Sequence, residues 1–222
     1  MISKLPKWIL YSAWLLAFVA GIVNVVGLLG FSHQAVTHLT GTTSLLGEAI
    51  ANRDGALTRH FLAALGSFVA GTVLSGFLIQ DSTLQLGRRY GVALLLEAAL
   101  LCMAPSLLRH NNVIGFYCAA CACGLQNAMV STYSGAVVRT THISGMFTDL
   151  GIFLGHSLRG LPVDTRRLRL SVLVISGFLC GGIIGTLLYQ KLDYAALYVP
   201  AALTAATAFI YGIYRWRTGR NP

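Results

Sequence analysis

The chain has 222 residues, of which 55% are hydrophobic and 10% are charged, and its mean hydropathy is +0.70. This composition excludes a soluble domain, because no hydrophilic stretch is long enough to fold alone. The net charge of +9 does not indicate nucleic-acid binding, since the basic residues are scattered through short connections, as is typical beside the cytosolic ends of membrane helices.

Six strongly apolar stretches are each long enough to cross a bilayer as a helix. They comprise residues 8–30, 59–79, 90–108, 113–134, 170–189 and 194–214. About 20 apolar residues span a hydrocarbon core of about 30 Å, and backbone polar groups in lipid require helices here. The sequence therefore predicts an all-α polytopic membrane protein, a helical bundle.

A short polar signature occurs twice in this apolar sequence. Each copy has a glycine and an amide, at 21–24 and 124–127, followed by Thr-His-x-(Thr/Ser)-Gly, at 37–41 and 141–145. A second match pairs the small-residue ladder Ser67/Gly71/Ser75 with a glycine ladder at 177–185. These ladders are typical of close helix packing. The two matched blocks predict two homologous helical halves, 1–110 and 111–222.

Two weaker segments, 37–52 and 141–158, are too polar to resemble ordinary spans. If they do not cross, each half has three spans and the halves are inverted; if they cross, each has four and the halves are parallel. If the first weak segment entered the membrane and turned back to its own side, the charged residues from Arg53 to His60, which follow it at once, would be left at membrane depth. Such a placement is costly. Sixteen helical residues reach about 24 Å. We therefore expect eight crossings, six strong spans plus two short polar membrane helices, with an interfacial placement as the rival.

One carboxylate lies in the middle of a strong span. Glu97 stands within a run of leucine and alanine residues at 94–100. An ionised carboxylate costs several kcal/mol there unless it is paired or faces water, so Glu97 needs a partner or a cavity. Two interpretations stay open, a proton or cation site and a structural hydrogen bond to a neighbouring helix.

Each weak helix has one polar face. The faces consist of residues spaced four apart on the first helix and seven apart on the second, namely Thr40, Ser44, Glu48, His142, Asp149 and His156. Such faces are typical of helices that line a solute path, although the same residues also serve to tie helices together. The Thr-Gly and Ser-Gly pairs at the helix starts leave N–H groups that suit an anionic group, with ordinary N-capping as the alternative.

Other polar and sulfur side chains lie inside strong spans. Asn24, Gln126 and Asn127 are expected to face one another, a weak helix or a solute. The Cys-x-x-Cys-x-Cys run at 118–123 has no histidine nearby in sequence, so we interpret its cysteines as small hydrophobes and expect no metal and no cofactor. No nucleophile elbow, phosphate loop or His-Glu-x-x-His motif is present, and we do not expect an enzyme.

The blocks at 24–41 and 127–145, with the length and the span pattern, make this chain resemble the YoaK family of small bacterial inner-membrane proteins. That family typically has a Val-Asp-Ala type triplet where this chain has Asn24 at the centre, and Thr-Gly-Asn where it has Thr-Gly-Thr at 40–42. The resemblance implies a transporter without an established substrate, in the inner membrane, and we place both termini in the cytosol. If the family's aspartate carries protons, this chain, which has an asparagine at that position, must use Glu97, Glu48 or Asp149 as the proton carrier instead.

These features lead to three hypotheses. The first is a secondary transporter for a small polar solute, coupled to protons through Glu97 or Asp149. The second is a structural or regulatory membrane subunit, and the last is an intramembrane enzyme acting on a lipid-like substrate. The expected partners are the lipid bilayer and an unidentified solute or proton, without nucleic acid, and homo-oligomerisation stays open. The expected path residues are Asn24, Thr37, His38, Thr40, Gly41, Ser44, Glu48, Glu97, Gln126, Asn127, Thr141, His142, Ser144, Gly145, Asp149 and His156.

Overall fold

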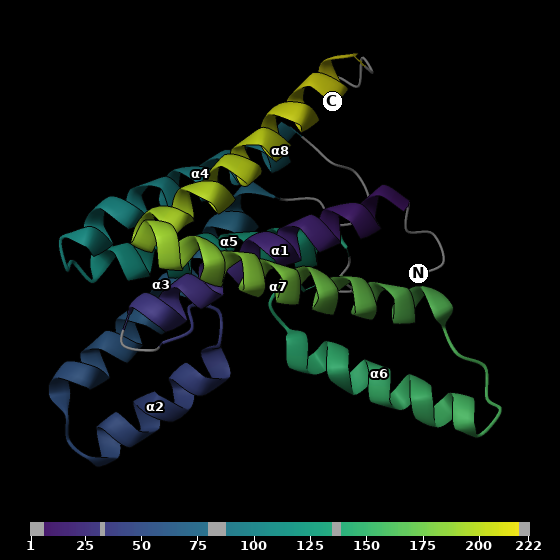
Figure 1. The fold of residues 1–222 in the computed structure, drawn as a ribbon, viewed down its shortest axis with the longest axis horizontal. Coiled ribbons are helices and arrows are strands. Elements are labelled where there is room, and N and C mark those ends of the chain that lie inside the picture. The colour runs from purple at the N-terminus through teal and green to yellow at the C-terminus, as the bar shows by residue number, and fades with distance from the viewer. Residues whose placement is uncertain (1–6, 32–33, 80–87, 135–138, 218–222) are drawn as a thin grey trace.

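The computed structural model describes residues 7–31, 34–79, 88–134 and 139–217, which form helices joined by short turns and loops (Figure 1). In chain order the elements are α1 (Lys7–Gly30), α2 (Leu39–Ala51), α3 (Gly55–Leu78), α4 (Arg88–Arg109), α5 (Ile114–Tyr133), α6 (Ile143–Leu158), α7 (Thr165–Leu192), the short 3-10 helix η2 (Asp193–Leu197) and α8 (Tyr198–Arg217). The long helices coincide with the strong spans of the sequence, and α2 and α6 with the two weak segments.

Five helical segments are long and apolar enough to cross a membrane. They are Leu10–Gly30, Gly55–Leu78, Arg89–Arg109, Ile114–Thr132 and Thr165–Arg217, the last of which contains α7, η2 and α8. The expectation of an all-α membrane protein is confirmed at this level. α2 and α6 are not among these segments, because their 13 and 16 residues are about 20 and 24 Å long.

Two aspartates start the long helices that follow α2 and α6. The Asp54 side chain accepts hydrogen bonds from the backbone N–H groups of the second and third residues after it, both at 3.0 Å. Asp164 does the same before α7, at 3.1 and 3.2 Å. A side-chain oxygen at this position satisfies N–H groups that have no partner within the helix. Both helices therefore begin several residues before the apolar stretches at 59 and 170.

Close glycine contacts hold the long helices in two pairs, α1 with α7 and α3 with α5. Gly181 lies against the backbone of Phe18, and Gly124 lies against the backbone of Phe68. A Cβ atom at either glycine would overlap a carbonyl oxygen. The glycines therefore let the helices approach to backbone contact, as expected from the small-residue ladders.

We call the end of the bundle at which α1 begins the near end, and the end at which Gly30 closes α1 the far end. Along α7, Gly177 contacts Trp14 and Gly185 contacts Ile22, so α7 runs parallel to α1, from the near end to the far end. In Figure 1, α1 and α7 lie side by side in this way.

α3 and α5 run in the opposite direction. The ring of Phe31, directly after α1, lies 5.5 Å from the ring of His60 in α3 and 4.9 Å from the ring of Phe116 in α5. Because both partners stand in the first turns of their helices, α3 and α5 begin at the far end. α4 returns toward the far end, since Leu108 near its close contacts Gly115 at the start of α5.

In the first half of the chain, α1 finishes and α3 begins at the same end of the bundle. The chain turns back before α2. Val36 lies beside Gly27, and Thr37 is bonded to Asn24, so residues 34–37 run back along the last turns of α1. α2 then runs out again beside α3. The charged turn around Arg53 thus lies at the far end and not at membrane depth.

The second half follows a corresponding path. Met129 near the close of α5 and Leu170 near the start of α7 share one buried cluster with Ala13 of α1. α5 therefore finishes, and α7 begins, at the near end. In Figure 1, α2 and α6 lie on the outside of the bundle, each beside the long helix that follows it. Neither short helix carries the chain from one end to the other.

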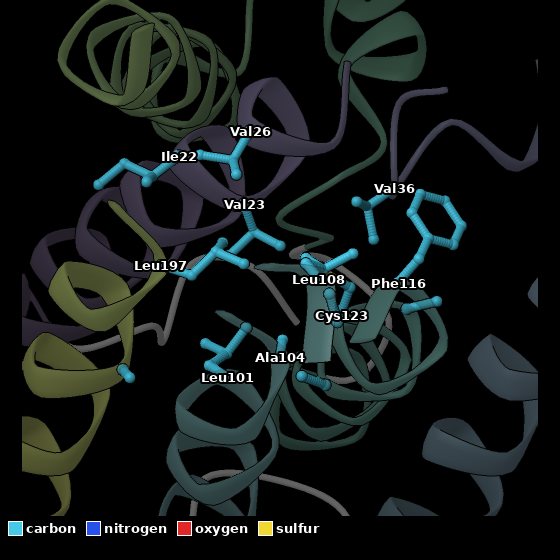
Figure 2. Close-up of a cluster of buried hydrophobic side chains, with 14 of the residues drawn as sticks. Ile22, Val23, Val26, Val36, Leu101, Ala104, Leu108, Phe116, Cys123 and Leu197 are labelled. Carbon is cyan, nitrogen blue, oxygen red and sulfur yellow. The ribbon is translucent and has the colours of Figure 1, made fainter. Parts of the chain in front are cut away.

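The apolar core lies where α1, α4, α5 and η2 meet. Figure 2 shows side chains from these elements converging, and Val23, Leu101, Ala104, Cys123 and Leu197 among them are each at most 4% exposed. Cys123 packs here as a small hydrophobe, which agrees with the interpretation of the cysteine run. This core surrounds the polar groups described next.

Candidate functional site

A buried polar cluster joins α4, α5 and the segment before α6. Glu97 on α4 is 1% exposed. Gln126 on α5 donates from Nε2 to Glu97 Oε1 at 2.8 Å, and Thr140 donates from Oγ1 to Gln126 Oε1 at 3.0 Å. Both ends of the Gln126 amide are thus occupied. The expectation that Glu97 has a partner is confirmed.

Within the described part of the chain, the second carboxyl oxygen of Glu97 has no hydrogen-bond partner. Thr204 on α8 lies against the carboxyl group, but Glu97 Oε2 and Thr204 Oγ1 are both buried without a hydrogen bond. The polar groups that act on the carboxyl, Gln126 and Thr204, are both neutral. An ionised carboxylate here has no cation to offset its cost, so binding and release of a proton change the charge of a closed, apolar site.

Asn24 fastens the returning segment to α1. Its Oδ1 accepts hydrogen bonds from Thr37, from the backbone N at 3.0 Å and from Oγ1 at 2.8 Å. Thr37 is buried, and Asn24 is half-buried. The amide therefore fixes the point at which the chain enters α2. It faces the weak segment, which is one of the alternatives expected for this residue.

The second copy of the signature differs from the first in its chemistry. Asn127 stands where the first copy has Asn24, and its Oδ1 is buried without a hydrogen-bond partner. Gln126, which donates to Glu97, and Thr140, which donates to Gln126, stand where the first copy has Val23 and Val36. The carboxyl cluster thus draws on the second copy, while the matching positions of the first copy belong to the apolar core.

The two histidines of the signature pack on the glycines that follow them. His38 and His142 precede α2 and α6 with nearly the same backbone, φ −91° in both and ψ 66° and 58°. Their rings lie over Gly41 and Gly145, where a Cβ atom would overlap the imidazole. Neither side chain caps its helix with a hydrogen bond. The glycines make room for the rings, and the first N–H groups of both helices receive no cap from the histidines.

The remaining expected path residues do not join Glu97. Their hydrogen bonds and ion pairs stay within their own helix or run to the next one. Ser44 donates to the Thr40 carbonyl oxygen at 3.2 Å, and Asp149 pairs with Arg167 of α7, with 3.8 Å between Oδ2 and Nε. The exposed or half-buried members of this set are Thr40, Ser44, Glu48, Thr141, His142, Ser144, Asp149 and His156.

A second polar group lies at the far end and was not predicted from the sequence. His60 on α3 meets Gln34 through Nε2 and Oε1 at 2.7 Å, and Tyr117 on α5 through Nδ1 and OH at 3.0 Å. The rings of Phe31 and Phe116 flank the imidazole, with centroids 5.5 and 5.8 Å away. With Gln34 Oε1 as acceptor, the imidazole carries its hydrogen on Nε2 and accepts from the tyrosine hydroxyl.

The chain matches the model of a known protein family. The family model described as "Protein of unknown function (DUF1275)" matches residues 12–210. No curated protein matches the chain, and no solved structure matches it. The expectation of an uncharacterised membrane family is thus confirmed, and the name YoaK stays a prediction.

Proposed function

We propose that this chain, which belongs to the DUF1275 family of membrane proteins of unknown function, is a permease that couples the movement of a small polar solute to protons through Glu97. The observation that carries the proposal is the buried carboxyl group where α4, α5 and α8 meet, with one oxygen bonded to Gln126 and the other without a partner. We infer no enzymatic activity and no cofactor.

The cluster provides a use for each protonation state of Glu97. A protonated carboxyl donates one hydrogen, for which Thr204 Oγ1 is the adjacent acceptor; an ionised carboxylate accepts, and the same hydroxyl donates to it. On the other side, Gln126 and Thr140 connect the carboxyl to the segment that leads into α6. A change of charge at Glu97 therefore acts directly on α8 and on the entry to α6, the kind of local event that biases a two-state element.

We further propose that residues 1–110 and 111–222 form two halves of inverted orientation with six crossing helices. In support, α1 runs from the near end to the far end and its counterpart α5 runs back, while α3 and α7 are likewise opposed and start on matching aspartate caps. α2 leads to the far end and α6 to the near end, so both begin toward the middle of the bundle, as broken helices do in transporters built from inverted repeats.

The charge distribution supports cytosolic termini in this arrangement. The basic residues of the described near end include Arg159, Arg166, Arg167, Arg169, Arg215 and Arg217, whereas those of the far end include Arg53, Arg59, Arg109 and Lys191. An excess of lysine and arginine marks the cytosolic side. We therefore propose that the near end faces the cytosol of a bacterial cell.

Single cysteines at Gly55 and Thr165, in an otherwise cysteine-free chain, test the inverted arrangement. Both residues begin helices, at the far end and the near end respectively. An impermeant maleimide added to intact cells should label the cysteine at position 55 and leave that at position 165 unlabelled until the membrane is opened. If intact cells label both cysteines or neither, the two positions lie on the same side of the membrane and the halves are parallel.

The transport proposal is tested with proteoliposomes that contain a pH-sensitive dye. A library of small polar solutes is added outside at equal pH, and a transported solute should change the internal pH with the wild type but not with Glu97→Gln. Glu48→Gln is the matched control, because Glu48 is exposed on α2. Solute-dependent pH changes of wild-type size in Glu97→Gln would remove Glu97 as the coupling group.

The second candidate is a structural membrane subunit, and one observation favours it. Both ends of the Gln126 amide are bonded, to Glu97 and to Thr140, as a purely structural link between helices requires. This alternative predicts no solute-dependent pH change with the wild type, and a Glu97→Leu variant that unfolds at a clearly lower temperature in detergent because it loses the acceptor for Gln126. The permease predicts a folded Glu97→Gln, since glutamine keeps the acceptor oxygen for Gln126.

A further inference from the structure

The amide of Gln34 has one half without a partner in the interior. Gln34 is 5% exposed, in the segment that returns toward α2. Its Oε1 meets His60 Nε2 at 2.7 Å, but its Nε2 is buried and makes no hydrogen bond to the residues that the structure describes. A buried donor that lacks an acceptor costs about 1–3 kcal/mol, so an acceptor that fills this position is favoured.

A small cavity adjoins this amide. Its volume is about 10 Å³, counted as the positions open to the centre of a water molecule, which is about the space of one small group. The walls are formed by α2, α3, α5 and the returning segment, namely Gln34, Val36, Leu39, Thr42, Ala64, Leu65, Phe68 and Phe116. No acidic side chain is among them, so nothing in the wall repels a negative charge.

The first turn of α2 forms one side of the same cavity. Leu39 and Thr42 line it, and the N–H groups of the first three helical residues have no acceptor within the helix. His38 does not cap them, because its ring is packed over Gly41. The start of a 13-residue helix carries a positive partial charge. The cavity thus lies beside both the start of α2 and the Gln34 amide.

We propose that this cavity binds a compact anion, either a free halide or the carboxylate head of a small solute, with Gln34 Nε2 as its side-chain donor. The shared chemistry is a small, negatively charged hydrogen-bond acceptor. The apolar walls and the size of the cavity exclude a larger group such as sulfate. This site stands apart from Glu97, and its binding of anions does not require that the chain transports anything.

Titration of purified protein with sodium bromide and sodium formate, at constant ionic strength in sodium sulfate, tests the site. Isothermal calorimetry should give saturable binding of bromide, formate or both to the wild type. Gln34→Glu keeps the oxygen that meets His60 and replaces the donor by a second acceptor, and it should weaken binding about tenfold or more. Ser75→Ala is the matched control, since Ser75 is an equally buried, unpartnered residue that does not line the cavity.

A bromide soak of wild-type crystals locates the anion without any variant. Anomalous density beside Gln34 Nε2 and the start of α2 is expected. Formate that displaces bromide would identify the carboxylate head as the ligand, and bromide binding that formate cannot displace would identify a halide. Absence of bromide density at Gln34 together with absence of saturable formate binding overturns the proposal, as does a folded Gln34→Glu variant with wild-type affinity. Gln34→Leu replaces Gln34→Glu in the titration if the glutamate variant does not fold.

Discussion

Replacement of Gly181 by alanine should destabilise the bundle, whereas the same replacement at the adjacent Gly182 should not. A Cβ atom at Gly181 would overlap the carbonyl oxygen of Phe18, and a backbone obstacle cannot rotate away; at Gly182 nothing lies within 4 Å. Overpacking costs about 1–3 kcal/mol. Removal of a helical glycine contributes about 1 kcal/mol of stability at both positions. The free energies of unfolding of the two variants should therefore differ by about 1–3 kcal/mol.

Thermal unfolding of the purified variants in detergent measures this difference. About 2–4 °C per kcal/mol places the Tm of Gly181→Ala roughly 2–12 °C below that of Gly182→Ala. Gly71 and Gly76 offer the same comparison on α3, because Gly71 faces the Cys121 carbonyl and Gly76 faces open space. Equal Tm values within both pairs would refute the backbone contacts between α1 and α7 and between α3 and α5.

Two further comparisons use the same unfolding assay. Asn24→Ala removes the acceptor of both hydrogen bonds from Thr37 and should cost about 1–3 kcal/mol. Asn127→Ala should cost less, because Asn127 Oδ1 has no partner to lose; the opposite ranking would mean that the two amides are misplaced. Asp149→Asn weakens a partly exposed pair with Arg167 and should change stability by less than about 1 kcal/mol. A larger loss would show that α6 depends on this pair.

The long helices were predictable because hydropathy alone determines them. The first apolar stretch was expected at 8–30, and α1 spans Lys7–Gly30. α3 and α7 begin several residues before the apolar stretches that start at 59 and 170. The side chains of Asp54 and Asp164 cap these helices by accepting hydrogen bonds from their first N–H groups. A hydropathy pattern does not detect such a cap, because the first turns of both helices contain charged residues.

The direction of the helices was not predictable from local patterns. It depends on four residues, 34–37, that return along α1 and are fixed by the bond between Asn24 and Thr37. The sequence marked both residues as polar path candidates but did not indicate that they bond to each other. The contact of Gln34 with His60 was missed for the same reason, since it joins residues from two elements and has no periodic signal.

The partners of Glu97 were predictable only in kind. A carboxyl group in a strong span requires a polar neighbour, and Gln126 was expected to face some polar group. That these two residues meet follows from the antiparallel packing of α4 and α5, which brings positions 29 residues apart to 2.8 Å. Thr140 and Thr204 stand outside the repeated signature, so no sequence pattern indicated them.

A comparison of two transport modes in one preparation tests proton coupling through Glu97 most directly. Once a transported solute is found, proteoliposomes with wild-type protein and with Glu97→Gln are assayed for accumulation driven by a pH gradient and for exchange of labelled solute at equal pH. Glu97→Gln should retain exchange and lose accumulation, because glutamine preserves the hydrogen bond from Gln126 but carries no titratable proton. Accumulation at the wild-type level in Glu97→Gln would contradict a role of this carboxyl group in coupling.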